Sequence, residues 1–65
     1  MVQKVISIVG VSKESFAKAA ENAVGVASKS VRNMKWARVH EFEMGLEGDK
    51  VVDYRATLRI YFDVE

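Results

Sequence analysis

Residues 51–64 read VVDYRATLRIYFDV, and apolar side chains occupy every second position over most of this segment. A period of two places alternate side chains on opposite faces of a β-strand, so the pattern predicts a strand with one buried and one uncovered face. The buried face holds Val52, Tyr54, Ala56, Leu58, Ile60, Phe62 and Val64. The other face holds Asp53, Arg55, Thr57, Arg59, Tyr61 and Asp63.

An amphipathic helix is predicted nearer the start of the chain. Residues 3–9 are rich in β-branched side chains and precede Gly10, which predicts a first strand that ends in a turn. Ser12 then stands where a helix N-cap is expected, and Glu14 lies near the positive end of the helix dipole. Apolar residues recur after this point at steps of three and four, which predicts about five helical turns. They are Phe16, Ala19, Ala20, Ala23, Ala27, Val31 and Met34.

Gly25 lies inside this predicted helix. Glycine costs about 1 kcal/mol relative to alanine in a helix interior. Either a neighbouring element approaches the helix very closely at Gly25, or the helix is weak there.

A further strand is predicted at residues 35–44, and a polar, glycine-containing loop at residues 46–50 joins it to residues 51–64 as a hairpin. One of its faces holds Ala37 and Val39, and the other holds Trp36, Arg38, His40 and Phe42. An alanine-rich helix leaves little depth above a sheet, so we expect the small Ala37 and Val39 to face it. Trp36 is then expected on the uncovered face. Hairpin pairing would set it on the same face as Arg55, Arg59 and Tyr61.

These elements predict one α+β domain over residues 1–65, in which a β-α-β-β order builds a three-stranded antiparallel sheet with one helix packed on one face. Such a short chain has little core and needs a disulfide, a metal or a partner chain. The absence of cysteine excludes disulfides and thiolate zinc sites, and a single histidine excludes an imidazole-rich metal site within one chain. Association with further copies is therefore expected.

The charge balance argues against a polyelectrolyte-binding protein. Ten Lys and Arg against nine Asp and Glu give a formal charge of +1, which gives no general attraction to nucleic acid or anionic membranes. No apolar run approaches the roughly 20 residues of a membrane span, and the first residues lack a signal peptide pattern. A cytoplasmic location is therefore the expectation.

Several segments together resemble the dodecins, small β-α-β-β proteins that assemble into hollow dodecameric shells and bind flavins without being enzymes. The resemblance covers essentially the whole chain and depends on segments in a characteristic order. They are Lys4-Val5-Ile6 to Val9-Gly10 followed by Ser12, Arg32-Asn33-Met34-Lys35-Trp36 with Val39 and Glu41, the pair Asp53-Tyr54, and Phe62. A homododecamer that stores, buffers or protects a flavin (FMN, riboflavin or FAD) is the function that this resemblance implies.

The resemblance also assigns site residues. Trp36 matches the tryptophan that stacks on the flavin ring, and Glu43 and Gly45 lie in the stretch that lines the flavin pocket. Arg55 stands where dodecins typically carry a glutamine. Arginine offers only donors where glutamine offers a donor and an acceptor, which predicts altered recognition of the flavin edge. Residues 30–32 match a region that holds coenzyme A phosphates in some dodecins, although a basic Arg32 near a helix end is explained equally well by the helix dipole.

Other functions remain open. A dodecin-like shell that binds another ligand or ions, or that is purely structural, is the main alternative, since symmetry axes multiply carboxylates into sites for Mg²⁺ or Ca²⁺. Composition alone also fits Trp36 as a simple interface residue. A less favoured alternative is a single-stranded RNA-binding protein. Its bases would stack on Trp36 and Tyr61, and Arg38, Arg55 and Arg59 would contact the RNA backbone. No catalytic motif is present in the sequence, so we do not expect an enzyme.

Overall fold

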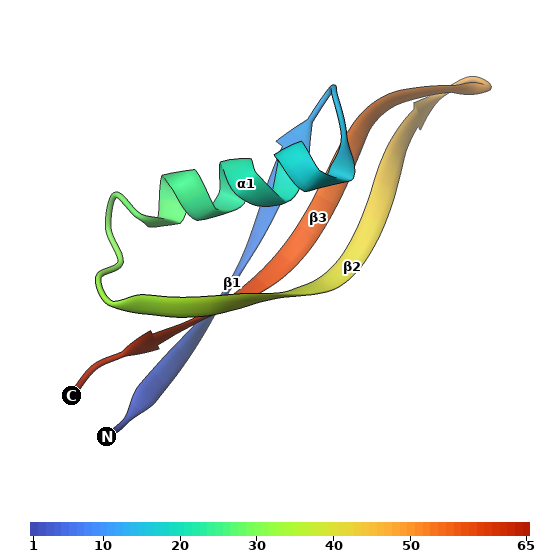
Figure 1. The fold of residues 1–65 in the computed structure, drawn as a ribbon. Coiled ribbons are helices and arrows are strands. Elements are labelled where there is room, and N and C mark those ends of the chain that lie inside the picture. The colour runs from blue at the N-terminus through green and yellow to red at the C-terminus, as the bar shows by residue number, and fades with distance from the viewer.

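The computed structural model contains four elements in the predicted β-α-β-β order, which are β1 (Gln3–Ser12), α1 (Phe16–Ala27), β2 (Met34–Glu47) and β3 (Lys50–Asp63). The strands form one antiparallel sheet in the order β1-β3-β2, and α1 lies along one face of it (Figure 1). The predicted α+β fold is therefore confirmed. Its one helix lacks the length and the apolar character needed to cross a membrane.

The core is a thin layer of small side chains between α1 and the sheet. Three helical alanines (Ala19, Ala23 and Ala27) and three residues of β3 (Ala56, Leu58 and Ile60) are buried. Gly10 of β1 is buried beneath the helix, and a Cβ atom at this position would collide with the backbone carbonyl of Ala19. At Gly10 the helix thus packs on β1 at a distance that only glycine allows.

The predicted end of the first strand and the predicted start of the helix are both wrong. Strand β1 continues through Gly10 to Ser12 instead of turning at Gly10, because this glycine serves helix packing. The N-cap is Ser15, whose hydroxyl accepts a hydrogen bond from the backbone N–H of Lys18 at 3.0 Å. The hydroxyl of Ser12 instead accepts from the N–H of Glu14 at 2.9 Å, in the connection between strand and helix.

The helix also ends earlier than predicted. It stops at Ala27, so Val31 and Met34 lie beyond it, and Met34 begins strand β2. The hydroxyl of Ser28 donates to the carbonyl of Gly25 at 2.7 Å, a local bond of the kind that competes with helix continuation. Asn33, at φ 61°, then turns the chain into the sheet.

Strand β2 is longer than predicted, and its faces change along its length. Ala37 and Val39 lie toward the helix as expected, since they line one groove together with residues of α1. The pairing shifts between Val39 and Glu41, where a bulge at His40 interrupts the alternation. Phe42 consequently contacts the ring of helix residue Phe16, at 4.8 Å between ring centres. Its predicted place on the face of Trp36 is therefore wrong.

One protomer leaves much apolar surface exposed. Only 8 of 65 residues are buried, and the accessible surface is 4795 Å². A compact monomer of 7.3 kDa would expose about 4,200 Å². The face of the sheet away from α1, which we call the open face, has no cover in the protomer (Figure 1). A groove between α1 and β2, lined by Val24, Ala37 and Val39 among others, is also exposed.

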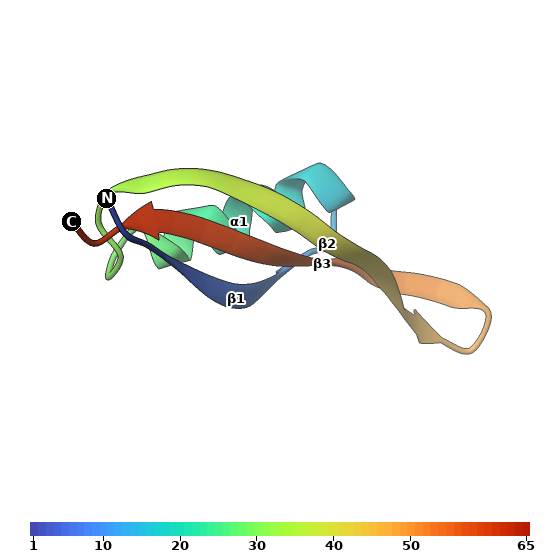
Figure 2. The same cartoon turned by 90° about the horizontal axis from the view of Figure 1, so that it is seen from below.

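The β2–β3 hairpin adds to this exposed surface. Pairing with β1 ends at Tyr54, so residues 45–53 continue as a two-stranded extension beyond the rest of the sheet (Figure 2). We call this extension the hairpin arm. It exposes the apolar Leu46, Val51 and Val52. An isolated two-stranded hairpin is marginally stable in water, so the arm favours contact with another chain.

Gly10 in the helix–sheet layer and Gly25 on the exposed side of α1 give a matched test of this packing. Gly10→Ala is expected to lower the free energy of unfolding by about 2 kcal/mol or more, because the added methyl group meets backbone that cannot yield. Gly25→Ala is expected to raise it by about 1 kcal/mol, since nothing lies within 4 Å of the added atom. Thermal and urea unfolding measure both variants. Equal destabilisation by the two substitutions would contradict this description of the core.

Candidate functional site

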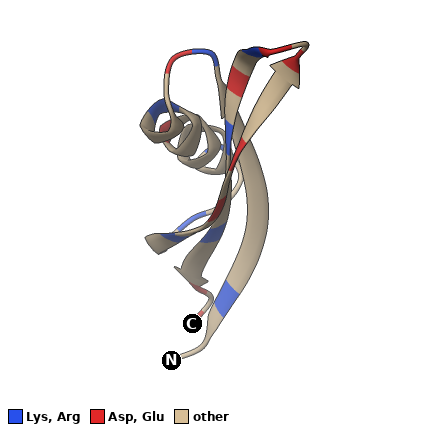
Figure 3. Ribbon diagram, turned by 90° about the vertical axis from the view of Figure 1, so that its right-hand side faces the viewer, with Lys and Arg blue, Asp and Glu red and all other residues tan.

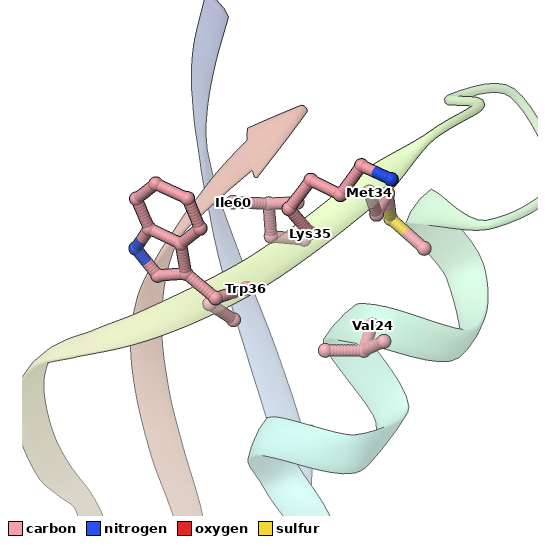
Figure 4. A pocket seen from close by; sticks show the side chains of 6 residues that line it. Val24, Met34, Lys35, Trp36 and Ile60 are labelled. Carbon is pink, nitrogen blue, oxygen red and sulfur yellow. The ribbon is translucent and has the colours of Figure 1, made fainter. Parts of the chain in front are cut away.

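An aromatic pair lies near one end of the open face. Trp36 of β2 stands directly opposite Tyr61 of β3 in the sheet register. The two rings are stacked, with 4.7 Å between their centres and 15° between their planes. In Figure 4 the ring of Trp36 lies on the opposite side of strand β2 from Val24 of the helix, although both residues line the same pocket. We call Trp36 and Tyr61 the aromatic platform.

The aromatic platform offers a surface for a further planar ring. Tyr61 covers one side of the indole, and Trp36 as a whole remains 47% exposed in the protomer. Exposed tryptophan of this kind is typical of ligand sites and interfaces, because stacking and apolar burial reinforce each other. The predicted location of Trp36 on the uncovered face is confirmed. Its stacking on Tyr61 was not predicted, although both residues had been assigned to this face.

A polar cluster lies at the other end of the open face, where the hairpin arm begins. The Nε of Arg55 donates to Oδ1 of Asp53 at 3.0 Å, and a second guanidinium nitrogen lies 3.4 Å from Oδ2. The same Oδ1 accepts from the backbone N–H of Gly45 at 3.1 Å. Glu43 stands opposite Arg55 in the register. We call these four residues the hairpin cluster.

Asp53 organises the hairpin cluster. A Cβ atom at Gly45 would collide with Oδ1 of Asp53, so the carboxylate occupies the space that any side chain at Gly45 would need. Arg55 forms its salt bridge with Asp53, although Glu43 stands opposite it in the register. The Arg55 side chain is still half exposed, and its remaining N–H groups are available to a ligand.

The predicted site residues fall into two separate groups within one chain. Trp36 is at the level of Tyr61, and Arg55 lies six positions before Tyr61 on the same strand. At roughly 3.3 Å per residue, the two ends of the open face are about 20 Å apart. Glu43, Gly45 and Arg55 do lie together, but no single protomer brings them to Trp36.

Charge is distributed unevenly over the two ends of the open face. Asp and Glu gather toward the hairpin end of the molecule (Figure 3). Glu41 and Glu43 there stand opposite Thr57 and Arg55. At the platform end, Arg38 and Arg59 stand opposite each other. The guanidinium carbon of Arg38 lies 5.9 Å from the ring centre of Tyr61.

Two further candidate sites, for a metal ion and for coenzyme A, are not formed within the protomer. No group of three His, Cys, Asp or Glu residues comes together to hold a metal ion, and His40 lies at the bulge of β2. Residues 30–32 lie after α1, in the turn that leads to β2. The helix-dipole explanation for Arg32 is therefore wrong, because the helix ends five residues earlier at Ala27.

Comparisons with known proteins match almost the whole chain to one family. A family model described as Dodecin matches residues 2–65. The chain is 39% identical over 61 residues to the calcium dodecin of Mycobacterium tuberculosis, covering 94% of this chain and 86% of that protein. The crystal structure of that protein, reported with a novel calcium-binding site, has a TM-score of 0.87 at 38% identity and covers 100% of this chain and 93% of its own. Dodecin from Streptomyces coelicolor has a TM-score of 0.93 at 28% identity, covering 98% and 91%.

Removal of the Asp53 carboxylate tests the hairpin cluster. We expect Asp53→Ala to speed hydrogen exchange at the Gly45 amide about fivefold to tenfold, because a hydrogen bond contributes roughly 1 kcal/mol. Asp49→Ala in the turn of the hairpin is the control, since Asp49 takes part in neither this hydrogen bond nor a salt bridge. NMR exchange at residue 45 is the measurement. Equal protection of this amide in both variants would show that Asp53 does not hold the hairpin cluster.

Proposed function

This chain belongs to the dodecin family, and we propose that it forms a hollow homododecameric shell that binds a flavin (FMN, riboflavin or FAD) on the open face. The observation that carries the proposal is the aromatic platform, a stacked Trp36–Tyr61 pair with the tryptophan 47% exposed. A broad indole face can stack on a large part of the tricyclic flavin ring. Such stacking contributes about 1 kcal/mol beyond the burial of apolar area.

The proposed site is shared between subunits. Since the aromatic platform and the hairpin cluster lie about 20 Å apart in one chain, a ligand stacked on Trp36 meets Arg55 only if a second subunit supplies it. Antiparallel juxtaposition of two open faces would bring the platform end of one subunit to the hairpin end of another. It would also bring the basic end to the acidic end, which is electrostatically favourable.

Within this site Arg55 would contact the polar edge of the flavin. Its Nε is taken by Asp53, so the ligand would receive hydrogen bonds from the terminal guanidinium nitrogens. These donors suit the flavin carbonyls or an anionic reduced ring, but they cannot accept from the ring N–H as the glutamine of related dodecins does. An unsatisfied buried donor costs roughly 1 to 3 kcal/mol, so binding of the oxidised flavin would be weaker by about tenfold or more.

The proposed role is storage, buffering or protection rather than catalysis. An indole stacked on a flavin quenches its excited state, which suits protection of a light-sensitive compound. A single-stranded RNA platform is less well supported, because Trp36 and Tyr61 stack on each other and offer one surface instead of two successive ones. A cytoplasmic location stays a prediction.

Calcium binding by the shell is a second candidate function. The relative at 39% identity is named calcium dodecin, and Glu41 and Glu43 lie on the open face of this chain near the hairpin arm. Asp53 already binds Arg55 and Gly45, and one protomer assembles no group of three metal ligands. A calcium site would therefore need carboxylates from several subunits, such as those that meet at a symmetry axis.

Flavin titration of the intact protein and of two variants tests the proposal. One variant replaces an aromatic residue on the open face, and the other replaces one on the helix side of the sheet. Riboflavin and FMN fluorescence is followed in EDTA, and we expect quenching at micromolar protein. Trp36→Leu should weaken binding about tenfold or more, because the stacking surface is lost. Phe42→Leu, an exposed aromatic on the helix side, should leave binding within about twofold. Absent quenching, with heat released on adding calcium, would favour the second candidate.

Sedimentation measures the proposed assembly. Twelve chains of 7.3 kDa give a particle of about 88 kDa, and this species should persist at micromolar concentration because the open face and the groove beside α1 need cover. Lys18→Gln, an exposed change on the helix outside this groove, serves as a control for surface charge. A folded monomer at these concentrations would contradict the proposed shell.

A further inference from the structure

Arg38 and Arg59 form an unusual pair on the open face. They are direct partners in the β2–β3 register, and both side chains lie on the face away from the helix. The two salt bridges of the chain join Lys35 to Asp63 and Arg55 to Asp53, so neither Arg38 nor Arg59 has an acidic partner in the protomer. Like charges directly opposite in a sheet are destabilising. This pair therefore calls for an anion from outside the chain.

The arginine pair adjoins the aromatic platform. Arg38 is two residues from Trp36 on β2, and Arg59 is two residues from Tyr61 on β3. Two residues of strand correspond to roughly 7 Å, which is within the reach of an arginine side chain. The guanidinium carbon of Arg38 already lies 5.9 Å from the ring centre of Tyr61. Stacking surface and unpaired positive charge thus occupy the same end of the open face.

We propose that Arg38 and Arg59 bind the phosphate of a ligand whose aromatic ring stacks on Trp36. This inference rests on the proposed flavin function and selects FMN over riboflavin, which lacks a phosphate. Guanidinium groups bind phosphate through paired, charge-assisted hydrogen bonds. Arg55 is less suited to this role because Asp53 neutralises it.

A carboxylate of another subunit is the competing partner for these arginines. Glu41 and Glu43 lie toward the other end of the open face, and an antiparallel neighbour would bring them toward Arg38 and Arg59. In that case the two arginines would hold the assembly together instead of holding a ligand. Removal of the arginines would weaken phosphate binding in the first arrangement and subunit assembly in the second.

The experiment compares FMN and riboflavin binding by fluorescence quenching in the intact protein and in the double variant Arg38→Gln, Arg59→Gln. The intact protein should bind FMN about tenfold more tightly than riboflavin. This preference should shrink in the double variant and at high salt, while riboflavin affinity stays within about twofold. Lys18→Gln, an exposed change on the helix, should keep the preference. Sedimentation of each variant reports the assembly.

The outcomes separate this inference from the proposed function. Equal affinity for FMN and riboflavin in the intact protein overturns the phosphate site and leaves flavin binding in place. Disassembly of the double variant overturns it as well, since the arginines would then pair with carboxylates of another subunit. Absence of binding by either flavin overturns the proposed function and this inference together.

Discussion

The close contact of α1 with β1 and β3 determines which surfaces of this protein remain uncovered. Gly10 and the alanines of α1 let the helix lie directly on two strands. A helix of 12 residues set this close covers neither β2 fully nor any part of the opposite face. The chain consequently carries an apolar groove on one side and the open face on the other, and both call for further subunits.

Two of the three irregularities in the β2–β3 pairing lie between the hairpin turn and Trp36, and they shape the open face. The register shifts at Val52 on β3 and again at His40 on β2. Each strand has one extra residue, so the two register shifts cancel. Trp36 therefore stands opposite Tyr61, as it would in a hairpin without shifts. Between the two shifts the faces of β2 are exchanged, which places Glu43 and Gly45 beside Arg55 and Asp53. The open face therefore ends in two chemically different groups.

Much of this arrangement follows from the sequence, and the exceptions have physical causes. The alternation in residues 51–64 predicted the central strand and its faces where β1 pairs with it, because β3 lacks a bulge there. Val52 and Val64, which were expected on the buried face, are each 42% exposed because they lie beyond this pairing. The face of Phe42 was wrong because a bulge leaves no mark in a period-two pattern. Gly10 was taken for a turn because close packing and turning both demand glycine. The distance between Trp36 and Arg55 could not be predicted, because it depends on the pairing register of β2 and β3 and the alternation of side chains does not determine this register.

In the proposed function, the open face is a composite surface that a second subunit and an aromatic ligand complete. A crystal structure of the protein grown with FMN tests it most directly. We expect a flavin ring stacked on Trp36, with Arg55 of another subunit within hydrogen-bond distance of the ring edge and the phosphate near Arg38 and Arg59. A structure in which the open face of the assembled protein is solvent-exposed, or in which Trp36 is covered by protein alone, would contradict it.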